Sequence, residues 1–429
     1  MRMLALAGGL TAGLAATPAV AAPATLKGKL YLSARDAAHG TEVWRTDGTK
    51  AGTKFVVDVN KGDDDAFPGP DSSSPSGFTR LGDRVVFAAN DGVKGLEVWR
   101  TNGTKAGTKL LKNINPGDDD GVPGPDGSAP SGFEKLGKRL YFGANDGTNG
   151  SELWRTDGTR KGTRRVKDIF PGAVGSAPSG LFRRGNHIYF RAHDGTSGAE
   201  VWRTDGTKQG TKLLDDINPG PGSSLPSAFS ALGKRIYFRA DDSMHGAEPW
   251  KTTGKPGDAK LLKDINPGGA GSDPIAFTRL GDRLYFAAED GVHGSELWRT
   301  DGKRKGTKLL KNIDPGDDDG VPGPDESNPF DLVTVAKRVF FSASDGIRGR
   351  ELWRTDGSRK GTRIVRNILA GSGSPFPCEL TRFRKRVLFG ALTPARGYEL
   401  WKSDGSRNGT RLLKDIDPGP TSGAPFGCD

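Results

Sequence analysis

The sequence predicts an all-β protein, an eight-bladed β-propeller built from eight repeats of about 48 residues. The first observation is that all eight tryptophans fall in one recurring phrase, at Trp44, Trp99, Trp154, Trp202, Trp250, Trp298, Trp353 and Trp401. The second is their spacing: successive tryptophans lie 55, 55, 48, 48, 48, 55 and 48 residues apart, so three copies carry the same seven-residue insert. A period in the forties is typical of propeller blades, of which a ring usually holds roughly four to eight.

Each repeat contains four short runs of strand-forming residues. In one copy these runs cover residues 179–183, 187–192, 200–203 and 211–217, and turn residues such as Asp194-Gly195 separate them. Such runs predict a four-stranded antiparallel meander. No stretch has the apolar spacing of a helix longer than a turn or two. Because one unit buries little by itself and needs neighbours on both faces, residues 22–429 are expected to form a single domain.

Residues 1–21 are expected to be a signal peptide rather than part of the fold. Arg2 supplies the positive start, residues 3–16 are apolar, and Ala19-Val20-Ala21 provides the small residues that signal peptidase requires. The apolar run is shorter than the ~20 residues that span a bilayer. We therefore expect cleavage after Ala21, a secreted or extracellular protein, and no membrane insertion.

The tryptophan phrase also resembles a known bacterial family. Residues 152–159 read Glu-Leu-Trp-Arg-Thr-Asp-Gly-Thr, and residues 296–302 and 351–357 begin in the same way. The chain is therefore similar to the ELWxxDGT-repeat proteins over nearly all of its mature length. This resemblance implies a secreted repeat propeller, and it supplies no reaction.

A glutamate stands two residues before every tryptophan, at Glu42, Glu97, Glu152, Glu200, Glu248, Glu296, Glu351 and Glu399. In a strand this glutamate and the tryptophan share one face, whereas the basic residue that follows the tryptophan points to the other. Eight equivalent carboxylates have eight equivalent environments, which does not suit a single catalytic site. We expect a structural role for both residues, with each glutamate accepting backbone or arginine hydrogen bonds between blades.

The three inserts are acidic and lie between the fourth strand of one blade and the first strand of the next. Their candidate metal ligands are Asp63, Asp65, Asp71, Asp118, Asp120, Asp126, Asp317, Asp319 and Asp325. Several carboxylates on a loop rich in Gly and Pro suit Ca²⁺, which prefers oxygen ligands. The inserts lack the alternating D-x-D-x-D-G spacing of a calcium loop, so a merely solvated loop is the alternative. No other cofactor is required.

The two cysteines, Cys378 and Cys428, occupy matching phrases about one repeat apart. Cys428 therefore belongs to a ninth, truncated first strand, and the N-terminal unit has only residues 24–26 in that position. We expect a Cys378–Cys428 disulfide that fixes the closing tail, since an oxidising extracellular setting favours it. Two buried free thiols are the alternative.

The net charge of +11 is expected to be divided between two faces. The inserts and the turns between second and third strands place acid on one face, whereas bases such as Lys50, Lys54 and Lys208 lie on the other. A basic face attracts anionic polymers. We therefore expect a non-enzymatic binding or surface-interaction module for an anionic glycan or a protein partner, with no specific nucleic acid.

Catalytic motifs are not evident in the sequence. It lacks a G-x-S-x-G nucleophile elbow and any His or Cys pair at metal-ligand spacing. The alternative function is a hydrolase or lyase at the mouth of the propeller channel. Unlike polar residues gathered where the repeats differ would favour that alternative.

Overall fold

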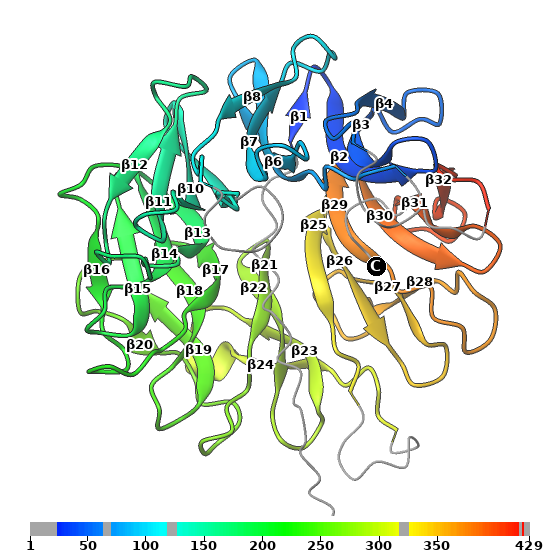
Figure 1. Cartoon of the computed structure of the whole chain (residues 1–429). Coiled ribbons are helices and arrows are strands. Elements are labelled where there is room, and N and C mark those ends of the chain that lie inside the picture. Colours follow the sequence, from blue (N-terminus) through cyan, green and yellow to red (C-terminus); the bar gives the residue numbers. More distant parts are fainter. Residues whose placement is uncertain (1–23, 63–69, 118–126, 317–325, 420–422, 424–429) are drawn as a thin grey trace, which may run out of the picture.

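A computed structural model describes residues 24–62, 70–117, 127–316, 326–419 and 423. The chain forms eight four-stranded antiparallel sheets, each made of consecutive strands, and they stand side by side as the blades of a ring (Figure 1). The predicted eight-bladed β-propeller is therefore confirmed. The described residues contain one 3₁₀ turn, Arg304–Gly306, and none of them forms a helix that could cross a bilayer.

The strands follow one order in every blade. Blades 1 to 4 comprise β1 (Thr25–Leu26), β2 (Lys29–Asp36), β3 (Gly40–Thr46) and β4 (Lys54–Val57); β5 (Ser76–Leu81), β6 (Arg84–Asn90), β7 (Leu96–Thr101) and β8 (Lys109–Lys112); β9 (Ser131–Leu136), β10 (Arg139–Asn145), β11 (Ser151–Thr156) and β12 (Arg164–Lys167); and β13 (Ser179–Arg184), β14 (His187–His193), β15 (Ala199–Thr204) and β16 (Lys212–Asp215).

The other four blades repeat this pattern. Blades 5 to 8 comprise β17 (Ser227–Leu232), β18 (Arg235–Asp241), β19 (Ala247–Thr252) and β20 (Lys260–Leu261); β21 (Ile275–Leu280), β22 (Arg283–Glu289), β23 (Ser295–Thr300) and β24 (Lys308–Lys311); β25 (Phe330–Val335), β26 (Arg338–Ser344), β27 (Arg350–Thr355) and β28 (Arg363–Arg366); and β29 (Cys378–Phe383), β30 (Arg386–Thr393), β31 (Gly397–Ser403) and β32 (Arg411–Lys414).

The fourth strand of the repeat analysed above is shorter than predicted. It ends at Asp215 rather than Ile217. The reason is a change of hydrogen-bond partner, because the Ile217 N–H donates to the Glu200 carboxylate at 3.1 Å and not to the neighbouring strand. The chain thus leaves the sheet where a side chain replaces the strand as acceptor.

The core lies in the seams between blades. Phe142 on β10 and Trp154 on β11 are cross-strand partners, and they pack against Val86, Val98 and Leu111 of the preceding blade. The position of Phe142 is occupied by a fully buried phenylalanine in seven blades, at Phe87, Phe142, Phe190, Phe238, Phe286, Phe341 and Phe389. Each sheet therefore buries both faces, as expected for blades stacked around an axis.

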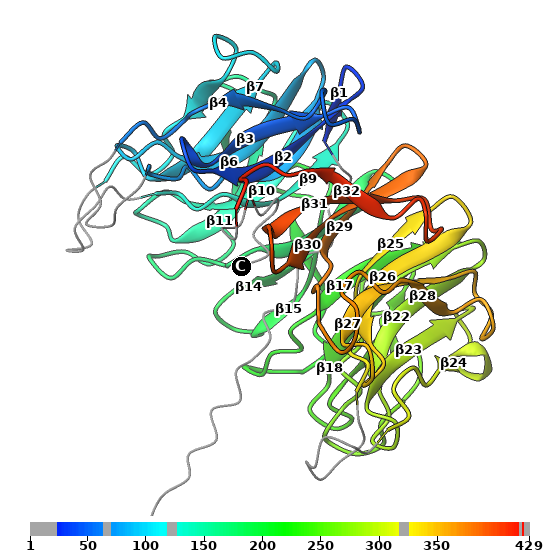
Figure 2. The same ribbon diagram turned by 90° about the vertical axis from the view of Figure 1, so that its right-hand side faces the viewer.

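The ring closes between the last blade and the first. Leu30, Leu32 and Trp44 of blade 1 pack with Leu388 and Leu400 of blade 8 in one buried cluster. In both views the last blade, drawn in red and orange, lies beside the first, drawn in blue (Figures 1 and 2). The same polar contacts recur at this seam as elsewhere, since Lys414 Nζ donates to Thr53 O at 2.9 Å, as Lys112 Nζ does to Thr163 O.

Alternating strand direction gives the disc two distinct surfaces. One carries the turns between second and third strands together with the links from blade to blade, and we call it the link face. The other carries the turns between first and second and between third and fourth strands, and we call it the turn face. The first strands of neighbouring blades contact one another around the axis from blade 2 to blade 8.

Candidate functional site

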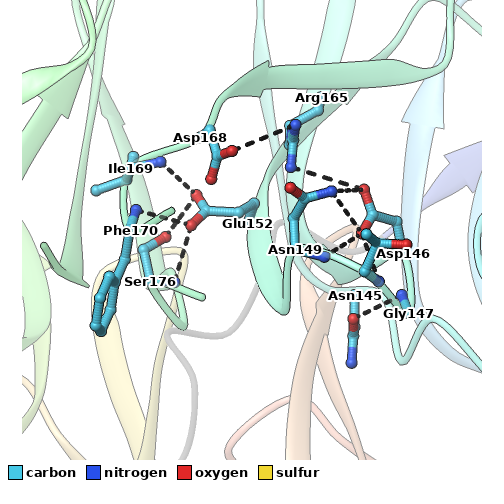
Figure 3. Close-up of polar contacts among 11 residues, drawn as sticks. Asn145, Asp146, Gly147, Asn149, Glu152, Arg165, Asp168, Ile169, Phe170 and Ser176 are labelled. Atoms are coloured by element: carbon cyan, nitrogen blue, oxygen red, sulfur yellow. Dashed lines mark hydrogen bonds and ion pairs between the residues drawn. The ribbon is translucent and has the colours of Figure 1, made fainter. Parts of the chain in front are cut away.

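The repeated glutamates hold the links between blades. All eight are fully buried. Glu152 accepts hydrogen bonds from the backbone N–H of Ile169 at 2.9 Å and of Phe170 at 3.0 Å, and from Ser176 through its N–H at 3.0 Å and its hydroxyl at 2.8 Å (Figure 3). Among the other glutamates the donors are backbone N–H and serine hydroxyl groups, joined at Glu97 and Glu351 by the side-chain amides of Asn113 and Asn367. No described arginine is among the donors. A side chain on the third strand thus fixes the path of the chain into the next blade.

Burial shifts the ionisation of these glutamates. It raises the pKa of Glu42, Glu200 and Glu296 to about 7, although hydrogen bonds from serine hydroxyls and backbone N–H groups oppose the shift. Two links lack the serine. Gly423 stands in its place at Glu399 and still donates its N–H, whereas Pro375 stands there at Glu351 and supplies neither a hydroxyl nor an N–H. Glu351 Oε2 is buried with no hydrogen-bond partner among the described residues, and burial raises the pKa of Glu351 to about 8.

The tryptophans and the basic residues near them join neighbouring blades. The base after the tryptophan reaches the next blade in seven of the eight blades, as when Arg155 donates to Gly206 O at 2.9 Å. A lysine near the end of the fourth strand does the same, because Lys167 Nζ donates to Thr211 O at 2.9 Å and lies 5.4 Å from the centre of the Trp202 ring. These repeated residues therefore build the seams between blades.

Most of the predicted calcium ligands lie outside the described residues. Asp71 is described and is partly buried at the end of the first insert. Asp63, Asp65, Asp118, Asp120, Asp126, Asp317, Asp319 and Asp325 are outside those ranges. Within them, no group of three or more His, Cys, Asp or Glu side chains could hold a metal ion. Calcium binding by the inserts stays a prediction.

The predicted signal peptide and the predicted disulfide also involve residues outside the described ranges. Residues 1–21 and Cys428 are not among those described, whereas Cys378 is the first residue of β29. Gly423 indicates how the tail begins, because its N–H donates to Glu399 Oε1 at 3.2 Å. The N–H of Ser176 makes the equivalent bond to Glu152 in another link. The signal peptide and the disulfide both stay predictions.

The turn face carries a regular set of exposed bases, which we call the basic ring. The first residue of every fourth strand is basic and exposed, at Lys54, Lys109, Arg164, Lys212, Lys260, Lys308, Arg363 and Arg411. None of these eight forms an ion pair with a described carboxylate; the pairs found involve other bases. They therefore remain available to an anionic partner.

Charge counting shows how strongly this face is biased. The eight ten-residue segments that run from the base after the tryptophan to the basic ring contain 28 Lys and Arg and seven Asp, a net +21. Since the whole chain carries +11, the remainder carries −10. On the link face, the eight six-residue segments that end at the glycine four residues before each tryptophan, such as residues 241–246, carry −5. The described parts of the links, counted from the fourteenth residue after each tryptophan to the next first strand, carry −9. The disc is therefore polarised, positive on the turn face and negative on the link face.

A pair of carboxylates breaks the repeat near the axis. Asp331 and Glu379 occupy equivalent positions in β25 and β29, where other blades have Gly77, Gly132 or Gly180. The equivalent residues all have positive φ, and the values for Asp331 and Glu379 are 58° and 52°. Because this left-handed region is unfavourable for residues other than glycine, the carboxylates occupy the position at a conformational cost.

The surroundings of the two carboxylates differ. Asp331 Oδ2 accepts the Leu380 N–H at 3.0 Å, so it provides a hydrogen-bond partner for a backbone group of β29, the first strand of the next blade. Burial raises its pKa. Solvent reaches the side chain of Glu379, but the protein around it partly desolvates the carboxylate and raises its pKa to about 7, with a further contribution from the charge of Asp331.

Sequence reasoning missed the serines and the axial carboxylates. The serines have a signal, because each stands 26 residues before the next tryptophan, at Ser73, Ser128, Ser176, Ser224, Ser272 and Ser327. Asp331 and Glu379 also have one, since each stands 22 residues before a tryptophan, where most blades have Gly or Ala. Aligning the repeats on the tryptophans would have shown both.

Comparison with solved structures supports the fold. A prolyl endopeptidase is 15% identical over 79% of this chain and 49% of that protein, with a TM-score of 0.50. A puromycin hydrolase mutant is 13% identical over 81% of this chain and 54% of that protein, with a TM-score of 0.50. A puromycin-hydrolysing peptidase of Mycobacterium tuberculosis is 11% identical over 81% and 53%, also with a TM-score of 0.50.

These likenesses concern the propeller scaffold. The chain spans about half the length of those peptidases, and at such identities the similarity shows the fold alone. No protein-family model and no curated protein sequence matches the chain. The resemblance to ELWxxDGT-repeat proteins therefore stays a prediction. What the comparisons establish is that this chain has the architecture of a β-propeller.

Proposed function

We propose that this protein is an exported binding module whose turn face captures an anionic polysaccharide. The observation that carries the proposal is the basic ring, in which eight exposed bases recur at one position and form no ion pair with described carboxylates. A repeated array of like charges suits a polymer with repeated opposite charges, because each blade can contact another monomer.

The chemistry of the face favours a glycan over a nucleic acid. Every exposed large apolar side chain among the described residues lies on the link face, so the turn face offers no exposed aromatic platform. Proteins that bind single-stranded nucleic acid usually combine charge with aromatic side chains on which bases stack. A carboxylated or sulfated polysaccharide is recognised by charge and requires no such platform.

A charge-removal experiment tests the proposal. The variant Lys212→Gln/Lys260→Gln/Lys308→Gln removes three adjacent members of the basic ring, and binding to polygalacturonate and dextran sulfate is measured by isothermal titration calorimetry. The control Lys61→Gln/Lys94→Gln/Arg348→Gln removes the same charge from the link face. We expect several-fold weaker binding in the first variant only, together with weakening by salt. An equal loss of affinity in both variants would mean that binding depends only on the net charge of the protein, and it would refute a site on the turn face.

Calcium assistance is a separate part of the proposal. A thermal-melt series with and without Ca²⁺ tests it, because a ligand that binds only the folded state raises the melting temperature. A Ca²⁺-dependent rise that disappears in Asp118→Asn/Asp120→Asn/Asp126→Asn supports a metal site in the inserts. An identical rise in that variant, or none in the parent protein, rejects it.

A second candidate function is catalysis near the axis, as a hydrolase or lyase. Asp331 and Glu379 favour it, since two neighbouring carboxylates with raised pKa values can divide the roles of acid and base. Incubation with polygalacturonate followed by a reducing-end assay tests this candidate. Cleavage that Glu379→Gln abolishes without changing binding supports an enzyme, and an intact polymer after prolonged incubation supports the binding module.

A further inference from the structure

The exposed large apolar side chains of the described residues all lie on the link face. They are Val93, Val174, Leu225, Met244, Val292, Ile347 and Phe376. Four of them stand at the same position of the turn between second and third strands, six residues before a tryptophan. Val93 is in blade 2, and the other three are in blades 5, 6 and 7, which are consecutive around the ring. Met244, Val292 and Ile347 are 71%, 70% and 69% exposed, and we call these three residues the apolar tips.

The apolar tips are held in a fixed conformation. In blade 5, Asp242 Oδ1 accepts the N–H of Met244 at 3.0 Å and of His245 at 2.8 Å. The same two bonds recur in the turns of Val292 and Ile347. Because the blades are equivalent and the turns have one length, the tips project from the disc in the same way. An apolar side chain fixed in an exposed position is suited to contact with a partner.

The charges around the tips identify the partner. Each turn aspartate is paired with the base after the tip, as in Asp242 with His245 at 2.8 Å, Asp290 with His293 and Asp345 with Arg348. Glu289 and Asp241, one residue before those aspartates, form no ion pair with a described base. Glu289 lies near Glu326 and Asp273, and its pKa is raised by burial and then by those two charges.

This sector concentrates negative charge. Residues 241–246, 289–294 and 344–349, together with the described links 264–274, 312–316 and 326–329, account for −8 of the −14 carried by the link-face segments counted above. Of the bases nearby, Arg239 is paired with Asp273 at 2.6 Å. Arg350 lies over the Phe330 ring and donates to Asn328 O. A cationic partner would therefore relieve repulsion that the protein itself leaves uncompensated.

We propose that the link face of blades 5 to 7 binds a basic polypeptide segment in which Lys or Arg alternates with apolar residues. Apolar side chains of the segment cover Met244, Val292 and Ile347, and its cations face Glu289 and Asp241. A lipid bilayer is disfavoured because membrane surfaces are commonly negative and would be repelled by this sector. The turn face of a second copy is basic but shows no exposed large apolar side chain among its described residues, so it would leave the tips uncovered.

Fluorescence anisotropy with labelled peptides tests this inference on the full mature chain. The probes are a peptide of alternating Lys and Leu, a Lys-Ser peptide and a Glu-Leu peptide of equal length. The tip variant is Met244→Ser/Val292→Ser/Ile347→Ser, and Thr148→Ser/Thr196→Ser changes the same turn position in blades 3 and 4 as a control. A third variant, Asp241→Asn/Glu289→Gln, removes both carboxylates and keeps the apolar tips; we call it the carboxylate variant.

The expected result is binding of the Lys-Leu peptide that weakens about tenfold or more in the tip variant and is unchanged in the control. The carboxylate variant weakens it several-fold, and the Glu-Leu peptide does not bind. Unchanged Lys-Leu binding in the tip variant, or equal binding of the Glu-Leu peptide, overturns the proposal. The proposal is also overturned if the parent protein binds phosphatidylcholine vesicles, or self-associates in sedimentation velocity, and only the tip variant loses that behaviour. Polygalacturonate binding should be the same in all these variants, so this test is independent of the proposed function.

Discussion

Removal of the serine hydroxyl in one link should measurably destabilise the whole ring. In Ser176→Ala, Glu152 loses the donor at 2.8 Å but keeps the backbone N–H groups of Ile169, Phe170 and residue 176. Hydrogen bonds to charged groups contribute roughly 1.5–3 kcal/mol, so a loss of about 2 kcal/mol is expected. With an unfolding entropy of ~2.1 cal/mol/K per residue over roughly 400 residues, this corresponds to a decrease in Tm of about 2–3 °C.

Differential scanning calorimetry at pH 7 measures this decrease, and Ser131→Ala is the matched control. Ser131 is exposed, and its hydroxyl makes no hydrogen bond to another described residue, so its Tm should equal that of the parent protein. Glu152→Ala should be far more damaging, since it leaves three buried N–H groups and a hydroxyl without an acceptor. A parental Tm in Ser176→Ala would refute the view that the glutamate-serine contact stabilises the links.

Three further predictions concern the same seams. Burial raises the pKa of Glu42, Glu200 and Glu296 to about 7 and that of Glu351 to about 8, above the ordinary value of 4.5. Because these pKa values are higher in the folded protein, the contribution of the four glutamates to stability is complete below about pH 4.5 and is lost as the pH rises through 7 to 8. Urea unfolding at pH 5, 7 and 9 should therefore show falling stability, and a stability that rises with pH would contradict this sign. Pro375→Ser should supply the missing donor to Glu351 and raise the free energy of unfolding, mostly at high pH. The expected gain is only ~1 kcal/mol because loss of the proline offsets part of it. An unchanged dependence of stability on pH would argue against this role of the serine. Lys167→Met removes the bond to Thr211 and the contact with Trp202 and should cost ~1–2 kcal/mol in urea unfolding, whereas the exposed Lys208→Met should cost nothing measurable.

The fold could be predicted in detail because the information lies along the chain. Every blade is one covalent repeat, so the tryptophan spacing gives the number of blades and the Asp-Gly turns give their strands. The residues at which individual strands end were harder to predict from the sequence. The fourth strand of blade 4 ends at Asp215 because the Glu200 carboxylate, 17 residues earlier, takes the N–H of Ile217.

The candidate site was predicted only in part. The division of charge into two faces follows from strand alternation, so it could be anticipated once the turns were assigned. The exposed state of the basic ring, by contrast, depends on which lysines are used in seams: Lys167 reaches the next blade, whereas Lys212 of the adjacent blade is exposed. The repeat register separates the two positions, since Lys212 begins a fourth strand and Lys167 ends one. Residue type does not, and packing decides which of the two positions finds a partner.

The sequence by itself determined the architecture of this protein, namely eight units of four antiparallel strands with tryptophan in every seam. The tertiary structure alone decided what the polar groups do. Glu152 meets Ser176 from the next link, and Asp331 meets the backbone of β29 in the next blade. The physical reason is that strand formation depends on neighbours in the chain, whereas the hydrogen-bond partner and the pKa of a buried carboxylate depend on segments that only closure of the ring brings together.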